Sequence, residues 1–332
     1  MSSPGPPQRS TPQRPELNFG RTLRRTLPDQ IKRNRRGSLI YAGLLVILLS
    51  ALGTTLVGMY APQHWVWGAA GSVVLGILAA LIATQAGPGL ILAVSQARPA
   101  EGLQRQVLEN VTEEMAIAAG IPMPQVYVID DSALNAFATG RDPKSGVVVV
   151  TSGLLDRLDR DELQGVVAHE IAHIRNYDIR FMATIGIVAG LIPLLADFML
   201  RSVFWGGGRR RSSDSNNQAA LVFMAVGLVL AILAPIFAKL LEMAVSRQRE
   251  YLADATAADL TRYPEGLARA LEKIAMDSEP LEVANRATAH LYIIDPLRKL
   301  DESSRNLFST HPPLRDRVRR LRNLMGSPSD LV

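Results

Sequence analysis

Two histidines and a glutamate have a spacing that suits metal chemistry. His169, Glu170 and His173 follow the pattern HExxH. On a helix, two imidazoles four residues apart project from one face and can hold a single metal ion. Glu170 then lies where it can take a proton from a water molecule whose pKa zinc lowers to about 7. The alternative of two surface histidines is disfavoured, because the chain has only 5 histidines and the pattern falls on a predicted helix.

A catalytic zinc needs a third protein ligand and an open fourth position for water. Glu250 is the candidate, and Asp254, four residues later on the same helical face, can orient a ligating histidine. The opposing interpretation is that both carboxylates are solvated and pair with Arg247 and Arg249, and the spacing leaves the two open. The chain contains no cysteine, so one Zn²⁺ per chain, held by nitrogen and oxygen, is the expected cofactor.

The HExxH motif requires a rigid domain around it. Residues 159 to 176 read as a helix with acidic residues in its first turn, and residues 103 to 119 as an amphipathic helix. Turn residues bound three short runs that predict strands: 125–129, 135–139 and 146–151. Residues 95–178 are therefore predicted to be the first part of an α+β domain. Residues 241–332 form the second part, with Leu314, Val318 and Leu321 on the buried face of a last helix.

Long apolar runs indicate that the chain is a membrane protein. The runs at 38–60 and 65–94 carry no charge and are long enough to cross a hydrocarbon core of about 30 Å. They predict a hairpin over 38–94, kinked or ended near Pro88. A second hairpin is expected over 179–240, from runs at about 179–203 and 219–240. It either spans the bilayer or lies buried or shallow, because Asp197 and prolines interrupt it.

The charge distribution predicts the topology. The net charge of +5 comes largely from a basic leader at residues 1–37, which is expected to be disordered. The loop at 61–64 has no Lys or Arg, so the leader and both parts of the domain are expected to be cytoplasmic. Arg209–Arg211 run against this rule. No nucleic-acid motif accompanies the basic residues, so nucleic acid is not an expected partner.

The motifs together resemble the HtpX-type family of membrane zinc endopeptidases, gluzincin-like relatives of the CAAX prenyl endopeptidases. The resemblance rests on HExxH and on four further segments: 135–140, 147–153, 246–254 and 309–313. It implies an α-helical integral membrane protein with a zincin-like α+β protease domain, mostly helical with a small β-sheet. It also implies metal ligation by His169, His173 and Glu250 and catalysis by Glu170.

The expected function is a zinc endopeptidase that cleaves misfolded or damaged membrane proteins in stress-related quality control. A selective processing peptidase of CAAX or signal-peptide-remnant type is the alternative. A transporter is disfavoured, since the first two runs hold no ionisable group, and a catalytically dead scaffold is expected to have lost Glu170 or a ligand. The expected location is multi-pass in a bacterial cytoplasmic membrane, with the active site just above the cytoplasmic face. Expected partners are peptide or membrane-protein substrates, the lipid bilayer, and unspecified membrane proteases or chaperones.

Two further segments are candidates for the substrate site. Asn135, Ala136, Phe137 and Ala138 are predicted to form an exposed strand edge beside the zinc, because backbone pairing holds a substrate extended without demanding particular side chains. An ordinary edge strand or turn is the alternative. His311, stiffened by two following prolines, is predicted to donate to the oxyanion of the attacked carbonyl. The resemblance also suggests that this imidazole blocks the metal in the free enzyme, whereas a plain helix-entry residue would do neither.

Overall fold

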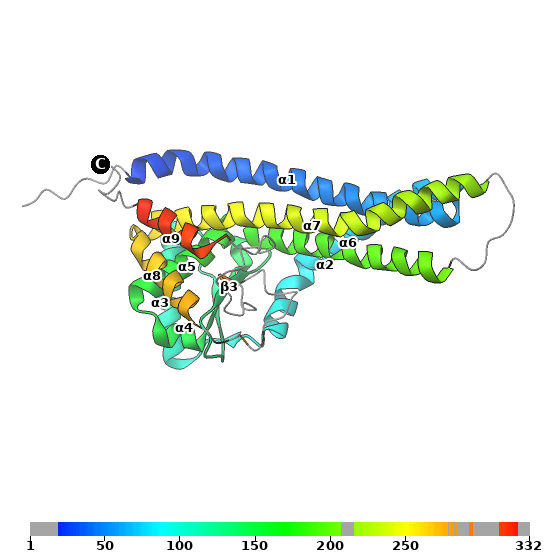
Figure 1. Ribbon diagram of the computed structural model, residues 1–332. Coiled ribbons are helices and arrows are strands. Elements are labelled where there is room, and N and C mark those ends of the chain that lie inside the picture. The colour runs from blue at the N-terminus through cyan, green and yellow to red at the C-terminus, as the bar shows by residue number, and fades with distance from the viewer. Residues whose placement is uncertain are drawn as a thin grey trace, which may run out of the picture.

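The computed structural model describes residues 19–206, 216–277, 279, 281, 283, 292–294 and 312–324. The fold is mostly helical with a four-stranded sheet. Four long helices run side by side, and the sheet and the shorter helices gather near one end of them (Figure 1). Their bounds are α1 Phe19–Tyr60, α2 Trp65–Val94, α6 Asp178–Gly206 and α7 Asn216–Thr261.

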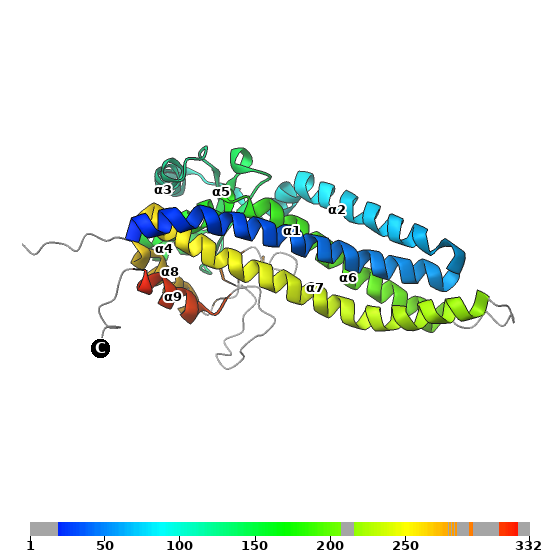
Figure 2. The same cartoon turned by 90° about the horizontal axis from the view of Figure 1, so that it is seen from above.

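The long helices form the two expected hairpins. A short 3₁₀ turn, Pro62–His64, joins α1 to α2. Helix α6 packs against both of them, and α7 packs against α1 and α6 (Figure 2). One apolar cluster holds α1, α6 and α7 together, and it includes Leu45, Leu49, Leu52, Ile192, Met199 and Ala234. Because these buried residues recur every three to four positions along each helix, they form the stripe that helix packing requires.

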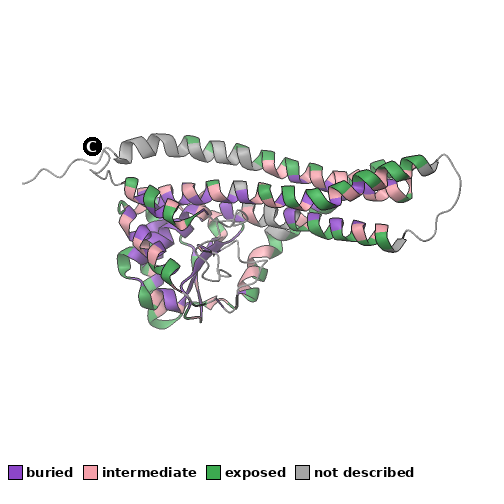
Figure 3. Cartoon of the chain, viewed as in Figure 1, coloured by how far each residue is buried: buried purple, intermediate pink, exposed green. Residues whose placement is uncertain are grey.

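Three segments of the described residues are long and apolar enough to cross a membrane: Leu39–Tyr60, Pro62–Ile82 and Gln218–Thr261. Away from the sheet, the long helices carry many exposed residues (Figure 3). Large apolar side chains stand among them, including Leu39, Ile47, Trp67, Ile82, Phe198 and Val222. Apolar surface of this extent is stable in contact with lipid and unfavourable in water.

One expectation about these helices needs correction. Residues 19–37 belong to α1 and are not part of a disordered leader, since Leu, Arg and Lys are good helix formers and extend the apolar span. Residues 1–18 lie outside the described part. Helix α2 covers the whole predicted run 65–94, with Pro88 inside it, so of the two alternatives at Pro88 the helix end is wrong. Helix α7 runs without a break from its apolar half through Glu250, so the fourth apolar run and the ligand helix are one element.

The small sheet has the order β1-β2-β4-β3, and β2 and β4 are parallel. Its strands are β1 Arg98–Pro99, β2 Gln125–Ile129, β3 Ala136–Thr139 and β4 Val147–Thr151. Alternate side chains of β2 and β4 enter two different cores. One core lies against helices α3 Gly102–Ala119, α5 Arg160–Arg175 and α8 Pro264–Met276. The three longer strands and α3 are as predicted, whereas β1 was not foreseen.

Helix α5 carries HExxH and is fixed at its start and along its length. The carboxylate of Asp159 accepts a hydrogen bond from the Glu162 backbone N–H, and the Glu162 carboxylate accepts one from the Asp159 N–H. This capping box satisfies two backbone donors that a helix start leaves free. At Gly165 the helix approaches α8 so closely that an added Cβ would lie 2.5 Å from the backbone N of Leu267. Glycine is therefore required at this crossing.

Gly165→Val is expected to lower the free energy of unfolding by about 1–3 kcal/mol or more, because backbone atoms of α8 cannot yield to the added side chain. Gly71→Val in α2 is the matched control, since no heavy atom lies within 4 Å of a Cβ built there. Thermal unfolding of both variants in detergent measures the difference. Equal midpoints would show that α5 and α8 do not pack this closely.

Candidate active site

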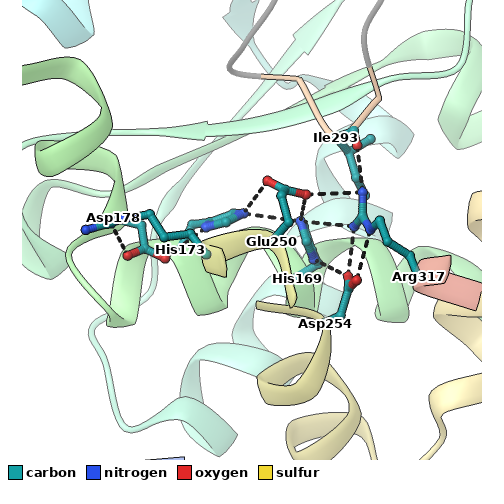
Figure 4. Close-up of polar contacts among 8 residues, drawn as sticks. His169, His173, Asp178, Glu250, Asp254, Ile293 and Arg317 are labelled. Atoms are coloured by element: carbon teal, nitrogen blue, oxygen red, sulfur yellow. Dashed lines mark hydrogen bonds and ion pairs between the residues drawn. The ribbon is translucent and has the colours of Figure 1, made fainter. Parts of the chain in front are cut away.

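Helices α5 and α7 bring together the three predicted ligands (Figure 4). His169 Nε2 lies 3.2 Å from His173 Nε2. Glu250 Oε2 is 3.6 Å from His169 Nε2, and Glu250 Oε1 is 3.5 Å from His173 Nε2. Among the residues that the structure describes, these three form a group whose ligand atoms all lie within 4.8 Å of one another.

The spacing of these atoms fits a zinc ion. Nitrogen and oxygen ligands about 2.0–2.2 Å from a tetrahedral zinc lie about 3.3–3.6 Å from each other, which is close to the observed separations. Two imidazoles and one carboxylate are also a ligand set found at catalytic zinc sites, where they leave the fourth position open. The residues present therefore fit the metal, and the sequence prediction of His169, His173 and Glu250 as one cluster holds.

Asp254 and Arg317 lie behind His169. The Nδ1 atom of His169 is 3.0 Å from Asp254 Oδ1, so its Nε2 atom faces the other two ligands. Arg317, from α9 Leu314–Asn323, donates to both carboxylate oxygens of Asp254 at 2.9 and 2.8 Å. It also donates to the Ile293 carbonyl at 2.9 Å and lies 3.1 Å from Glu250. The expectation that Asp254 orients a ligating histidine agrees with this geometry.

Asp178 lies behind His173 and was not foreseen. Its Oδ2 atom is 3.1 Å from His173 Nδ1, and its other oxygen pairs with Arg249. Glu250 and Asp254 are both buried, so the alternative of two solvated carboxylates is wrong. Each histidine accordingly has an aspartate on its Nδ1 side, and each aspartate has an arginine.

Glu170 is buried beside the ligands, with 2% of its surface exposed. Burial raises the pKa of its carboxyl to about 8; the charge of Glu250 adds to this shift, and that of His173 opposes it. The backbone N–H of Ala138 in β3 donates to the Glu170 carboxylate, which favours its charged form. A buried carboxyl with a raised pKa is suited to exchanging protons near neutral pH.

The pKa values of the two histidines are shifted in opposite directions. Burial lowers the pKa of His169. Burial also acts to lower the pKa of His173, but hydrogen bonds to Asp178 and Glu250 outweigh it and raise that pKa to about 10. A metal ion must displace the proton of His173, because only a neutral imidazole can bind it.

Strand β3 is the edge strand nearest to Glu170, as expected, but it is not exposed. Residues 135–139 are all buried. The Ile293 N–H donates to the Ala136 carbonyl at 2.9 Å, and the Asn135 side chain donates to the Ile294 carbonyl. Segment 292–294 therefore lies on the outer edge of β3 and shields part of it. Phe137 faces away from Glu170 and packs edge-on against Tyr292, with ring centroids 5.1 Å apart.

His311 lies outside the described residues, so its predicted role stays a prediction. Besides Asp178, the sequence did not reveal Arg317, which is 1% exposed. It follows His311 by six positions and shares the predicted buried face of α9 with Leu314, Val318 and Leu321. A charge on the apolar face of an amphipathic helix is the signal that could have singled it out.

The site lies within a part of the chain that matches a known protein family. The family model described as Peptidase family M48 matches residues 102–325. A protein named Protease HtpX homolog from Thermoanaerobacter pseudethanolicus is 45% identical over 304 residues, covering 91% of this chain and 99% of that protein. A protein of the same name from Dictyoglomus thermophilum is 53% identical over 237 residues, covering 71% of this chain and 75% of that one.

A solved structure shares the fold. Ste24p of S. mikatae superposes with a TM-score of 0.50 at 22% identity, and the match covers 90% of this chain and 66% of Ste24p. The earlier resemblance to HtpX-type proteases and the expected fold class are both confirmed by these findings. The chain belongs to peptidase family M48 and is a membrane metallopeptidase.

Proposed function

We propose that the protein is a zinc endopeptidase that cleaves misfolded or damaged membrane proteins at the cytoplasmic face of a bacterial inner membrane. The observation that carries the proposal is the convergence of three ligand atoms, within 4.8 Å of each other, beside a buried glutamate. His169, His173 and Glu250 would hold the metal. Zinc held there would supply Lewis acidity, which would lower the pKa of the attacking water and polarise the peptide carbonyl.

The residues of the chain perform the proton transfers. Glu170 accepts a proton from the attacking water and returns it to the leaving amine, so one carboxyl acts as base and then as acid. Ala138 holds the Glu170 carboxylate from the β3 side. Strand β3 aligns the substrate backbone beside Glu170, using the part of its edge that segment 292–294 does not cover. His311 is the proposed oxyanion donor.

The location of the site supports the proposal that the substrates emerge from the bilayer. Helix α7 contains both an apolar segment and the ligand Glu250. Helix α6 begins five residues after His173. Both ligand helices are thus joined directly to the long hairpin helices. Unfolded segments close to the membrane surface are therefore the substrates that we propose.

Removal of the metal tests the proposed chemistry. Purified protein in detergent is expected to contain one zinc per chain, and a chelator should abolish cleavage of an unfolded substrate such as casein. Addition of stoichiometric Zn²⁺ should restore cleavage, since the ligands remain in place. Full activity in protein shown by metal analysis to be free of divalent ions would rule out the proposal.

The substrate class needs a separate measurement. We expect cleavage of a destabilised membrane protein in proteoliposomes and much slower cleavage of its stable parent. A prenylated CAAX peptide should be cleaved no faster than its unprenylated form. Preference for the prenylated peptide would instead favour the selective processing alternative.

A further inference from the structure

We infer that Asp178 and Arg249 form a positioning pair that holds His173 for the metal and makes metal affinity depend on how α6 packs against α7. The inference rests on the proposed zinc site. Asp254 and Arg317 serve His169 from the α7 and α9 side, whereas the second pair lies at the base of the α6–α7 hairpin. The two sides of the metal site are consequently fixed by different parts of the fold.

The first step is the contact between Asp178 and His173. Asp178 Oδ2 lies 3.1 Å from His173 Nδ1, and His173 Nε2 faces His169 and Glu250. When the ring is neutral, a proton on Nδ1 donated to this carboxylate leaves the lone pair of Nε2 for the metal. A carboxylate in this position also limits rotation of the ring and makes the ligand a better donor.

Arg249 in turn holds Asp178 in place. The Arg249 guanidinium pairs with Asp178 Oδ1, and each side chain is only 6% exposed. A buried carboxylate without a nearby cation is strongly unfavourable, so the pair forms as a unit. Arg249 directly precedes the ligand Glu250 on α7. Helix α7 therefore supplies the metal ligand Glu250 and also Arg249, the cation that holds Asp178 beside His173.

The backbone links this pair to the hairpin. Helix α5 ends at Arg175, and Asp178 is the first residue of α6. Between them, Tyr177 has a φ of 61°, an uncommon conformation for a non-glycine residue, which turns the chain from one helix into the next. Asp178 thus moves with α6, and Arg249 moves with α7. A displacement of α6 along α7 would pull Asp178 away from His173 or from Arg249.

Four variants test the inference: Asp178→Asn, Arg249→Met, Arg249→Lys and the double variant Asp178→Asn/Arg249→Met. Asp197→Asn is the matched control, since Asp197 forms an exposed ion pair with Arg201 on the same helix α6, at 2.7 Å. The zinc dissociation constant is measured by competition with a chromogenic chelator. The absorption spectrum of Co²⁺ bound in place of zinc reports ligand geometry. Circular dichroism confirms that each variant is folded.

Asp178→Asn is expected to raise the zinc dissociation constant roughly 10- to 100-fold and to change the Co²⁺ spectrum, as loss of a ligand's partner does in other metal sites. Arg249→Met should have an effect in the same direction, and Arg249→Lys should recover most of the affinity. The double variant should bind zinc as Asp178→Asn does, because Arg249 acts through Asp178. The control should match the wild type.

Two outcomes would contradict this inference. Unchanged affinity and spectrum in Asp178→Asn would remove Asp178 from its role. Independent, additive effects of the two substitutions would show that Arg249 acts elsewhere. If Arg249→Met does not accumulate because it leaves Asp178 uncompensated, the double variant, which removes both charges, is compared with Asp178→Asn. A wild type that binds no zinc would instead overturn the proposed function.

Discussion

Glu170→Gln is expected to lower peptide cleavage by about 10²–10⁴-fold while zinc remains bound, because the substitution removes a proton acceptor and no ligand. Glutamine has nearly the shape of glutamate and can keep a hydrogen bond in the buried space beside Ala138. Hydrolysis of a quenched fluorescent peptide measures turnover, and metal analysis of the same sample measures zinc. The comparison separates the proton transfer from the metal site.

His169→Ala provides the contrasting control. This variant should lose zinc and activity together, since one of three ligands is gone. Asp254→Ala should weaken zinc binding by roughly 10- to 100-fold, because it removes the partner of His169. Appreciable turnover by zinc-loaded Glu170→Gln would assign the general base to another residue.

The sequence predicts most of the fold, because long-range periodicity and turn residues report on burial directly. The long apolar runs, the amphipathic helix before Gly120 and the β-branched strands all appear near their expected positions. The start of α1 is an element that the sequence did not predict. Residues 19–37 are polar enough to predict disorder, yet they extend a helix that the following apolar span has already nucleated. Composition alone does not carry that information.

The two histidine ligands could be predicted because their spacing is local, whereas the spacing left Glu250 open and the family resemblance assigned it. His169 and His173 belong to one helical turn, and Glu250 has Asp254 as its neighbour on one helical face. Asp178 and Arg317 could not be predicted, because their roles depend on ion pairs with residues far away in the sequence. Asp178 meets Arg249 over 71 positions of sequence, and Arg317 meets Asp254 over 63. No periodic pattern records contacts of this kind.

Strand β3 shows a different limit of sequence reasoning. Its place beside the metal site was expected because a peptidase must hold its substrate extended. Its burial was not expected, because the covering residues 292–294 lie far away in the sequence: Asn135 and Ile294 are 159 positions apart. The substrate edge is therefore narrower than residues 135–138 suggest.

Arg317→Met is expected to destabilise the domain by about 3–5 kcal/mol and to weaken zinc binding, because it leaves buried carboxylates without their cation. Burial acts to lower the pKa of Arg317, but Asp254 and Glu250 outweigh it and raise that pKa above its usual value, so the side chain is fully charged. It also donates to the Ile293 carbonyl, which ties segment 292–294 to the site. Arg317→Met therefore removes contacts with the ligand Glu250, with Asp254 behind His169, and with segment 292–294 on the edge of β3.

Arg319→Met, two positions along the same helix, is the matched control. Arg319 has a 70% exposed side chain and pairs with Asp316 on the surface, so its loss should change stability little. Denaturant unfolding in detergent, with and without zinc, measures both variants. The double variant Asp254→Asn/Arg317→Met should regain part of the stability lost in Arg317→Met, because it removes one uncompensated charge. If Arg317→Met unfolded at the same denaturant concentration as Arg319→Met, the buried network around His169 would not contribute to the stability of the fold.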